Sequence, residues 1–188
     1  EGRIGPLVDN LTSILHPLQV RMRTDPTVLV AAMNGAAAGG GLGLALACDA
    51  RIASPEAKLA AAFFKLGLSP DGGTTWLLPR LVGNQVTRRF FFNDEVWSGS
   101  EAHEKGAVDE VVAMDELIDT AVQMAAKWGK WSQLSRSGTK QLLDASTSTF
   151  FQTQLEFEQA LIIAASQTKE FEEGVTAFLE KRDPDFGS

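Results

Sequence analysis

Four glycines occupy five consecutive positions, 39–43, within the run AMNGAAAGGGLGLALACD at residues 32–49. Glycine inside regular structure is unfavourable by roughly 0.5–1 kcal/mol relative to alanine, so this run needs a reason in backbone geometry or close approach. Four explanations are open: a phosphate cradle, a dinucleotide-binding turn, a tight packing surface, and a site where backbone N–H groups reach a ligand.

The residues around the run exclude some of these explanations. A phosphate loop of the Walker type needs Gly-Lys-Ser or Gly-Lys-Thr after its glycines, and neither follows here. The dinucleotide-binding pattern fits Gly41 and Gly43, but Leu46 stands at its third glycine position, and no suitable acidic residue follows. Close helix packing stays open, as does an oxyanion hole formed by N–H groups at a helix start.

Short strands alternate with helical patterns on both sides of the run. Strands are expected at 27–33, 51–53, 58–62 and 107–112. A helix is expected from about residue 40 to 48, which directly follows the turn at Asn34-Gly35 and the small residues after it. Strands separated by helices predict an α/β layer arrangement.

Two further helical patterns in this part contain proline. Leucines and other apolar residues recur at helical spacing over 7–22, where Pro17 should bend or divide the helix and Asp25-Pro26 should end it. The segment at 74–83 follows a strong turn signal, Ser-Pro-Asp-Gly-Gly, and is expected to be a helix interrupted near Pro79.

The character of the chain changes after residue 113, where four helical patterns follow one another. Their Phe- and Leu-rich faces are too large for a small appendage to bury alone, so they should pack against the main domain or a second subunit. We therefore predict an α/β core over 1–113 and a helical C-terminal region over 114–188.

Charge and residue counts restrict the class of function. A net charge of -7 over 188 residues disfavours nucleic acid as the main partner, and no apolar stretch reaches the ~18 residues of a membrane span. The single cysteine, Cys48, excludes an internal disulfide framework. His16 and His103 lack the clustered spacing of metal ligands, so we predict no metal site. A cytoplasmic protein is the default expectation, because the first residues lack the pattern of a signal peptide.

Four segments, in linked order, make the chain resemble the crotonase (enoyl-CoA hydratase/isomerase) superfamily from about residue 27 to 186. They are MNGAAAGGGLGLALACDARIAS, LGLSPDGGTTWLLPRLVG, WSGSEAHEKGAVDEVV and FLEKRDPDF. The resemblance implies a crotonase-like ββα spiral with a helical C-terminal trimerisation region, a homotrimer or dimer of trimers, and acyl-CoA substrates. No cofactor is implied other than the coenzyme A of the thioester itself.

The resemblance also assigns site residues. The N–H of Gly40 is expected to donate to the thioester oxygen, with Gly39 and Gly41 small enough for the substrate to lie against them. In hydratases of the superfamily two glutamates act, and Gly43 and Phe63 stand at their positions here. The remaining carboxylate is Asp71, which matches the working aspartate of members that shift double bonds or open ring epoxides.

Asp71 has alternative interpretations. Before Gly-Gly-Thr-Thr it could cap a helix, which stabilises by ~1 kcal/mol without catalysis. The dehalogenases of the superfamily use this position as a nucleophile, but they place a tryptophan where this chain has Phe63. The surrounding segment looks closest to the phenylacetate-pathway isomerases. We therefore predict an acyl-CoA isomerase, with a hydratase or hydrolase that uses a carboxylate outside this chain, or an inactive CoA-binding homologue, as alternatives.

Four side chains are candidates for substrate contact. Phe63 and Trp76 either line an acyl pocket or belong to the core. Phe178 and Lys181 match positions that reach the CoA adenine and phosphate, although Lys181 could equally be a solvated helix end. The first strands of the spiral, with a loop that supplies the other oxyanion donor, have no match before residue 27. We therefore expect the chain to be incomplete and that part of the spiral to lie outside it.

Overall fold

The computed structural model describes residues 4–187. The first three residues of the predicted core, 1–3, and the last residue of the predicted helical region, 188, lie outside the described residues. Two compact units are present. The core unit contains the chain up to residue 23 and residues 29–125, and the helical unit contains residues 24–28 and the chain from residue 126. No helix among the described residues is long and apolar enough to cross a membrane.

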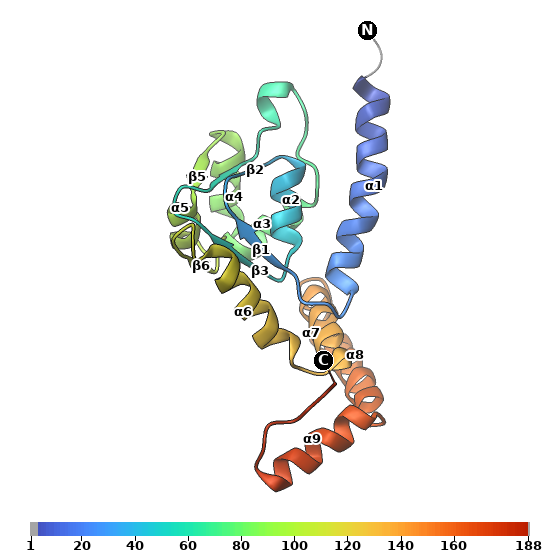
Figure 1. The fold of residues 1–188 in the computed structure, drawn as a ribbon. Coiled ribbons are helices and arrows are strands. Elements are labelled where there is room, and N and C mark those ends of the chain that lie inside the picture. Colours follow the sequence, from blue (N-terminus) through green and yellow to red (C-terminus); the bar gives the residue numbers. More distant parts are fainter. Residues whose placement is uncertain (1–3, 188) are drawn as a thin grey trace. The chain divides into compact units, whose positions relative to one another are not determined.

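Two small sheets lie at the centre of the core unit (Figure 1). In one sheet, β1 (Val30–Met33), β3 (Ala50–Ala53) and β6 (Glu110–Val111) are parallel, with Val30 opposite Ala50. In the other, β4 (Lys58–Ala60) pairs parallel with β2 (Ala36–Ala38) and antiparallel with β5 (Val96–Ser98). The predicted α/β class is confirmed, whereas β2 and β5 were not predicted, because strands of three residues carry little periodic signal.

The helices of the core unit surround these strands. They are α1 (Ile4–Thr24), α2 (Gly40–Ala47), α3 (Thr74–Val82), α4 (Asn84–Phe92), α5 (Gly99–Glu104) and most of α6 (Leu117–Gly129), with a short 3-10 turn, η1 (Phe64–Leu66). The α2 helix is central, since Leu42 and Leu46 are almost inaccessible to solvent. The core continues through Leu78 to Phe90, whose ring centroid lies 4.4 Å from that of Trp97.

Both prolines predicted to interrupt helices are accommodated inside them. The α1 helix passes Pro17 undivided and ends at Thr24, directly before Asp25-Pro26 as predicted. The predicted interruption near Pro79 is wrong, because α3 continues to Val82. Proline removes one backbone donor, and here the burial of Leu77 and Leu78 on the turn before it favours the continuous helix.

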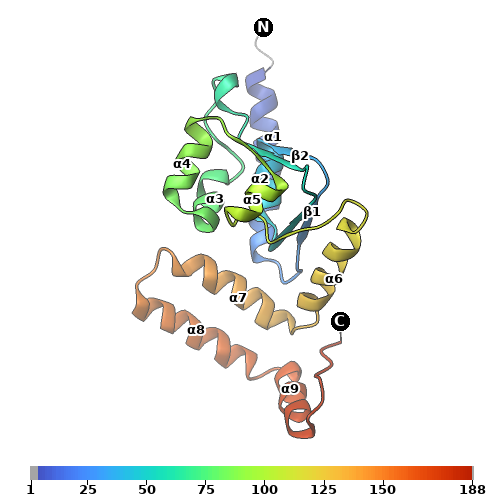
Figure 2. The ribbon, with the colours of Figure 1, turned by 90° about the vertical axis from the view of Figure 1, so that its left-hand side faces the viewer.

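The helical unit contains three complete helices, α7 (Gln133–Ser146), α8 (Phe151–Ala165) and α9 (Lys169–Glu180). Together with α6 they confirm the four helices predicted after residue 113. Figure 2 shows α7 and α8 as a hairpin. The buried Nζ of Lys140 donates to the carbonyls of Asp25 and Thr27 at 3.1 and 2.7 Å, which holds the segment 24–28 on α7.

An ion pair closes the C-terminal end of this unit. Arg182 donates to both carboxylate oxygens of Glu173, at 2.6 and 2.9 Å, and the backbone N–H of Asp185 donates to one of them. These hydrogen bonds, those of Arg182 first, lower the pKa of Glu173 to about 2.

Candidate active site

The glycine run forms a sharp entry into α2. Gly39 has a φ of 55°, in the region that favours glycine, and its N–H donates to the carbonyl of Ala61 at 3.1 Å. Its own carbonyl accepts the first helical hydrogen bond, from Gly43 at 3.1 Å. The helix therefore begins at Gly40, as predicted from the sequence.

The first turn of α2 presents backbone N–H groups without partners in the helix. No hydrogen bond from the N–H of Gly40 is made within the part of the chain that the structure describes, and α2 carries no acidic side chain in its first turn. No side chain of α2 itself therefore compensates the partial positive charge of its helix start. Such a site can stabilise an oxyanion.

A second backbone feature places Asp71 beside this helix start. Gly72 and Gly73 have φ angles of 63° and 69°, and the carbonyl of Asp71 accepts from Thr74 through both N and Oγ1. The residue that caps α3 is Gly73, without a side-chain hydrogen bond. The interpretation of Asp71 as the helix cap is therefore wrong, and its carboxylate is available for another role.

The Asp71 turn rests directly on α2. A Cβ atom added at Gly43 would lie 2.2 Å from the carbonyl oxygen of Gly72, and one added at Gly72 would lie 3.5 Å from the Cα of Gly40. The close approach explains why residue 43 is glycine, and it leaves no room for a glutamate there without movement of the turn. It also brings the two predicted catalytic residues, Gly40 and Asp71, into one site.

The α1 helix runs beside α2 (Figure 1) and contacts this site through three residues, Leu15, His16 and Gln19. The Leu15 side chain would lie 3.3 Å from a Cβ added at Gly40. The His16 Nε2 atom is 2.8 Å from Asp71 Oδ1. One turn further, the buried Gln19 Nε2 donates to the Gly72 carbonyl at 2.8 Å.

Neither His16 nor Gln19 was predicted as a site residue. Both precede the Asp71 turn by more than 50 positions, so no local pattern connects them. One signal was present in the sequence: Gln19 stands on the apolar stripe of α1, four residues after Leu15. A polar residue on a buried helix face requires a hydrogen-bond partner.

The predicted aromatic contacts lie in different places. Phe63 is 7% exposed, and its ring is 3.9 Å from a Cβ added at Gly39, so it packs behind the glycine run. Trp76 instead lines a small pocket of about 170 Å³ with Cys48 and Asp49, past the carboxyl end of α2. The Arg80 guanidinium lies 3.4 Å above its ring. The structure does not bring Trp76 to Gly40.

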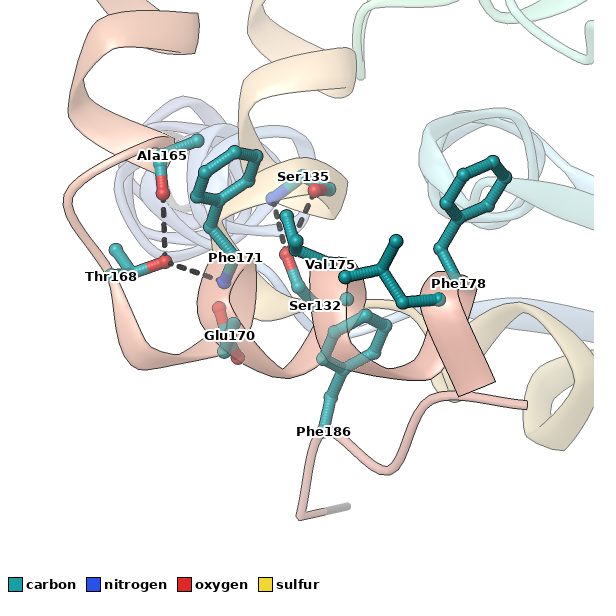
Figure 3. Close-up of a pocket in the computed structure, with 11 residues that line it drawn as sticks. Ser132, Ser135, Ala165, Thr168, Glu170, Phe171, Val175, Phe178 and Phe186 are labelled. Carbon is teal, nitrogen blue, oxygen red and sulfur yellow. Dashed lines mark hydrogen bonds between the residues drawn. The ribbon is translucent and has the colours of Figure 1, made fainter. Parts of the chain in front are cut away.

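Phe178 and Lys181 belong to the helical unit, and Figure 3 shows the pocket that Phe178 lines there. The pocket has a volume of about 370 Å³ and is largely apolar, with Phe171 and Phe186 among its walls. Phe178 is 82% exposed, and Lys181 ends α9 with a φ of 56°. Within residues 4–187, no cluster of three or more His, Cys, Asp or Glu side chains could hold a metal ion.

Known proteins of one family match this chain over almost its whole length. A sequence model of the enoyl-CoA hydratase/isomerase family matches residues 9–188. The 1,2-epoxyphenylacetyl-CoA isomerase of Escherichia coli is 37% identical over 185 residues, which cover 97% of this chain and 71% of that protein. The 2,3-dehydroadipyl-CoA hydratase of the same organism is 34% identical over 180 residues, with 96% and 71% covered.

Solved structures of enoyl-CoA hydratases also match this chain. The crystal structure of an enoyl-CoA hydratase from Bacillus anthracis matches with a TM-score of 0.89 at 31% identity, covering 96% of this chain and 70% of that one. An enoyl-CoA hydratase from Polaromonas sp. JS666 matches with a TM-score of 0.87, also at 31% identity, with 97% and 72% covered. The α/β architecture, the small sheets and the C-terminal helices are thus those of a crotonase-like fold.

Proposed function

Because the chain belongs to the enoyl-CoA hydratase/isomerase family, we propose that it is an acyl-CoA isomerase with Asp71 as its acid and base. The reaction is either a double-bond shift in an enoyl-CoA or the rearrangement of a ring-1,2-epoxyphenylacetyl-CoA. In both, the thioester carbonyl becomes an enolate-like oxyanion. The name of the 1,2-epoxyphenylacetyl-CoA isomerase of E. coli supports the second substrate class.

The start of α2 suits the stabilisation of this oxyanion. In our proposal the N–H of Gly40 donates to the thioester oxygen, while Gly39 and Gly41 allow the substrate to approach the backbone. One well-placed donor of this kind contributes about 3 kcal/mol to the transition state.

The contact between Gly43 and Gly72 supports isomerisation rather than hydration. The α2 helix contains no glutamate, and a side chain at residue 43 would meet the Gly72 carbonyl, so Asp71 is the carboxylate beside this helix start. A single carboxylate can take a proton from one carbon and return it to another. Isomerisation needs one such acid and base beside the oxyanion hole, whereas hydration also needs an activated water molecule.

Hydration is the second candidate, supported by the identity to the 2,3-dehydroadipyl-CoA hydratase of E. coli. It would require a carboxylate outside this chain to activate water, with Asp71 as partner. The product then differs from that of isomerisation by the mass of one water molecule.

The helical unit is proposed to bind CoA and to form the subunit interface. The α8 helix buries none of its residues, and Phe150 and Phe151 at its start are 87% and 78% exposed. Large apolar side chains exposed together usually mark an interaction surface. A homotrimer or a dimer of trimers would cover them, and Phe178 and Lys181 would then contact CoA. Light scattering of the purified protein, which measures the molar mass, tests the assembly.

The catalytic assignment is tested with a full-length protein that contains this chain. We expect it to convert a 3-enoyl-CoA into the conjugated 2-enoyl-CoA, followed by ultraviolet absorbance and mass spectrometry. Asp71→Asn should lower kcat by about 10²- to 10⁴-fold. Asp115→Asn, which changes an exposed aspartate before α6, is the matched control and should retain the wild-type rate.

The possible results separate the candidates. Full activity in Asp71→Asn would refute the role of this residue. A product heavier than the substrate by one water would favour hydration. Binding of enoyl- and aryl-CoA esters without any turnover would instead indicate a CoA-binding homologue that has lost catalysis.

A further inference from the structure

A histidine and an aspartate from distant parts of the core unit meet beside the start of α2. The Nε2 atom of His16 lies 2.8 Å from Oδ1 of Asp71, and the two side chains are 51% and 38% exposed. Both groups are therefore in contact with solvent. No hydrogen bond from a described residue to the other carboxylate oxygen of Asp71, Oδ2, is present.

The position of His16 is fixed from both sides. Its neighbour Leu15 packs against Gly40, and Gln19 donates a buried hydrogen bond to the Gly72 carbonyl. These two contacts hold the part of α1 that carries His16 beside the Asp71 turn. A pair this exposed contributes only ~0–1 kcal/mol to stability, so stability alone gives little reason for it.

We propose that His16 is a proton relay between Asp71 and solvent. This inference rests on the proposed isomerase function, with Asp71 as the base. His16 acts through Asp71 rather than on the substrate, and is therefore a positioning and relay residue. As a consequence of the relay, the proton returned to the substrate comes from water and is not the proton that was removed.

The relay consists of balanced proton transfers. Asp71 takes a proton from the carbon beside the thioester carbonyl, and the electron pair of the C–H bond passes into the enolate. The exposed imidazole exchanges its N–H proton with water, and in the tautomer that carries its proton on Nδ1 the lone pair of Nε2 is free. Rotation of the carboxyl group then brings the Asp71 O–H to Nε2, which accepts the proton. The exposed imidazolium exchanges its N–H protons with water. The reverse transfers then deliver a solvent proton through Asp71 to the new carbon, with nothing oxidised or reduced.

The test measures the origin of that proton. Wild-type protein is given trans-3-hexenoyl-CoA in D₂O, the reaction is stopped at low conversion, and the deuterium content of the 2-hexenoyl-CoA is measured by mass spectrometry. The wild-type product should contain solvent deuterium. In His16→Gln the amide still donates to Asp71 but cannot accept a proton, so the deuterium content should fall severalfold while isomerisation continues.

The chain offers a matched control, because it contains only one other histidine. His103 lies on α5 with Nδ1 3.0 Å from the Val108 carbonyl, and His103→Gln should leave the labelling unchanged. Recovered substrate is analysed as well, to correct for exchange before the reaction.

The results that would overturn the relay differ from those that would overturn the isomerase. Equal labelling in wild type and His16→Gln, or an unlabelled wild-type product, would refute the relay and leave the isomerase intact. Loss of all turnover in a folded His16→Gln protein would also refute it, since Asp71 alone should still carry a proton. No isomerisation by the wild type would refute both proposals.

Discussion

Replacement of Gly43 by alanine tests the contact on which the site depends. The added methyl group would lie 2.2 Å from the Gly72 carbonyl oxygen, 2.9 Å from its carbon and 3.0 Å from Gln19 Nε2. Two of these atoms belong to the backbone, so the turn itself must move away from α2. Such a movement also displaces Asp71, the residue before it.

The expected cost follows from three contributions. Overpacking of a buried site costs typically ~1–3 kcal/mol. Displacement of Gly72 weakens its hydrogen bond with Gln19, which is worth about 1 kcal/mol. Alanine is a better helix former than glycine by up to ~1 kcal/mol, which offsets part of the loss. The net destabilisation is about 2 kcal/mol, or a decrease in Tm of roughly 4–8 °C for a chain of this size.

Urea and thermal unfolding of Gly43→Ala measure this cost. Gly41→Ala is the matched control for stability, because a Cβ added at Gly41 has nothing within 4 Å. It should be neutral or stabilising by up to ~1 kcal/mol. If Gly43→Ala unfolds at the same urea concentration as Gly41→Ala, the turn does not rest on α2 as described, and the explanation for the missing glutamate fails.

Two further predictions concern single hydrogen bonds. Gln19→Met keeps the length of the side chain but removes the donor to Gly72, and should cost about 1–3 kcal/mol in urea unfolding because a buried carbonyl is left unpaired; unchanged stability would mean that this bond does not hold the turn. In the helical unit, the pKa of Glu173 is lowered to about 2 from 4.5, so its ionised form stabilises the fold above about pH 4.5, and the contribution is lost as the pH falls through 2. Circular dichroism during acid titration should therefore show Glu173→Gln less helical than wild type at neutral pH and equal to it near pH 2; a difference that persists there would exclude the pair with Arg182 as its cause.

The elements that could be predicted from the sequence are those with a strong local pattern. The helix start at Gly40 was predictable because glycines followed by leucines mark a backbone entry into a buried helix, and the four C-terminal helices have a clear apolar period. The strand at Ala36–Ala38 was not predictable. Alanine has no preference for strands, and this strand exists because its pairing with Lys58–Ala60 supplies the hydrogen bonds.

The site shows the same division between local and distant information. The Asp71 turn was predictable from its own residues, since only glycine readily adopts the positive φ angles at 72 and 73. The partners from α1 were not, because a contact between His16 and Asp71 depends on how α1 packs against α2. The sequence indicates this packing only indirectly, through small residues such as Gly40 that allow α1 to approach α2.

The absence of a glutamate and the presence of the histidine have a common structural basis. Glycine at residue 43 allows the Gly72 carbonyl to pack directly against α2. In that position the carbonyl accepts a hydrogen bond from the side-chain amide of Gln19. The same turn of α1 that carries Gln19 carries His16, three residues earlier, over Asp71. A glutamate at residue 43 would therefore do more than add a second carboxylate. It would raise the turn, break the contact with Gln19 and separate Asp71 from its imidazole, so Gly43→Glu alone should lose isomerisation without gaining hydration.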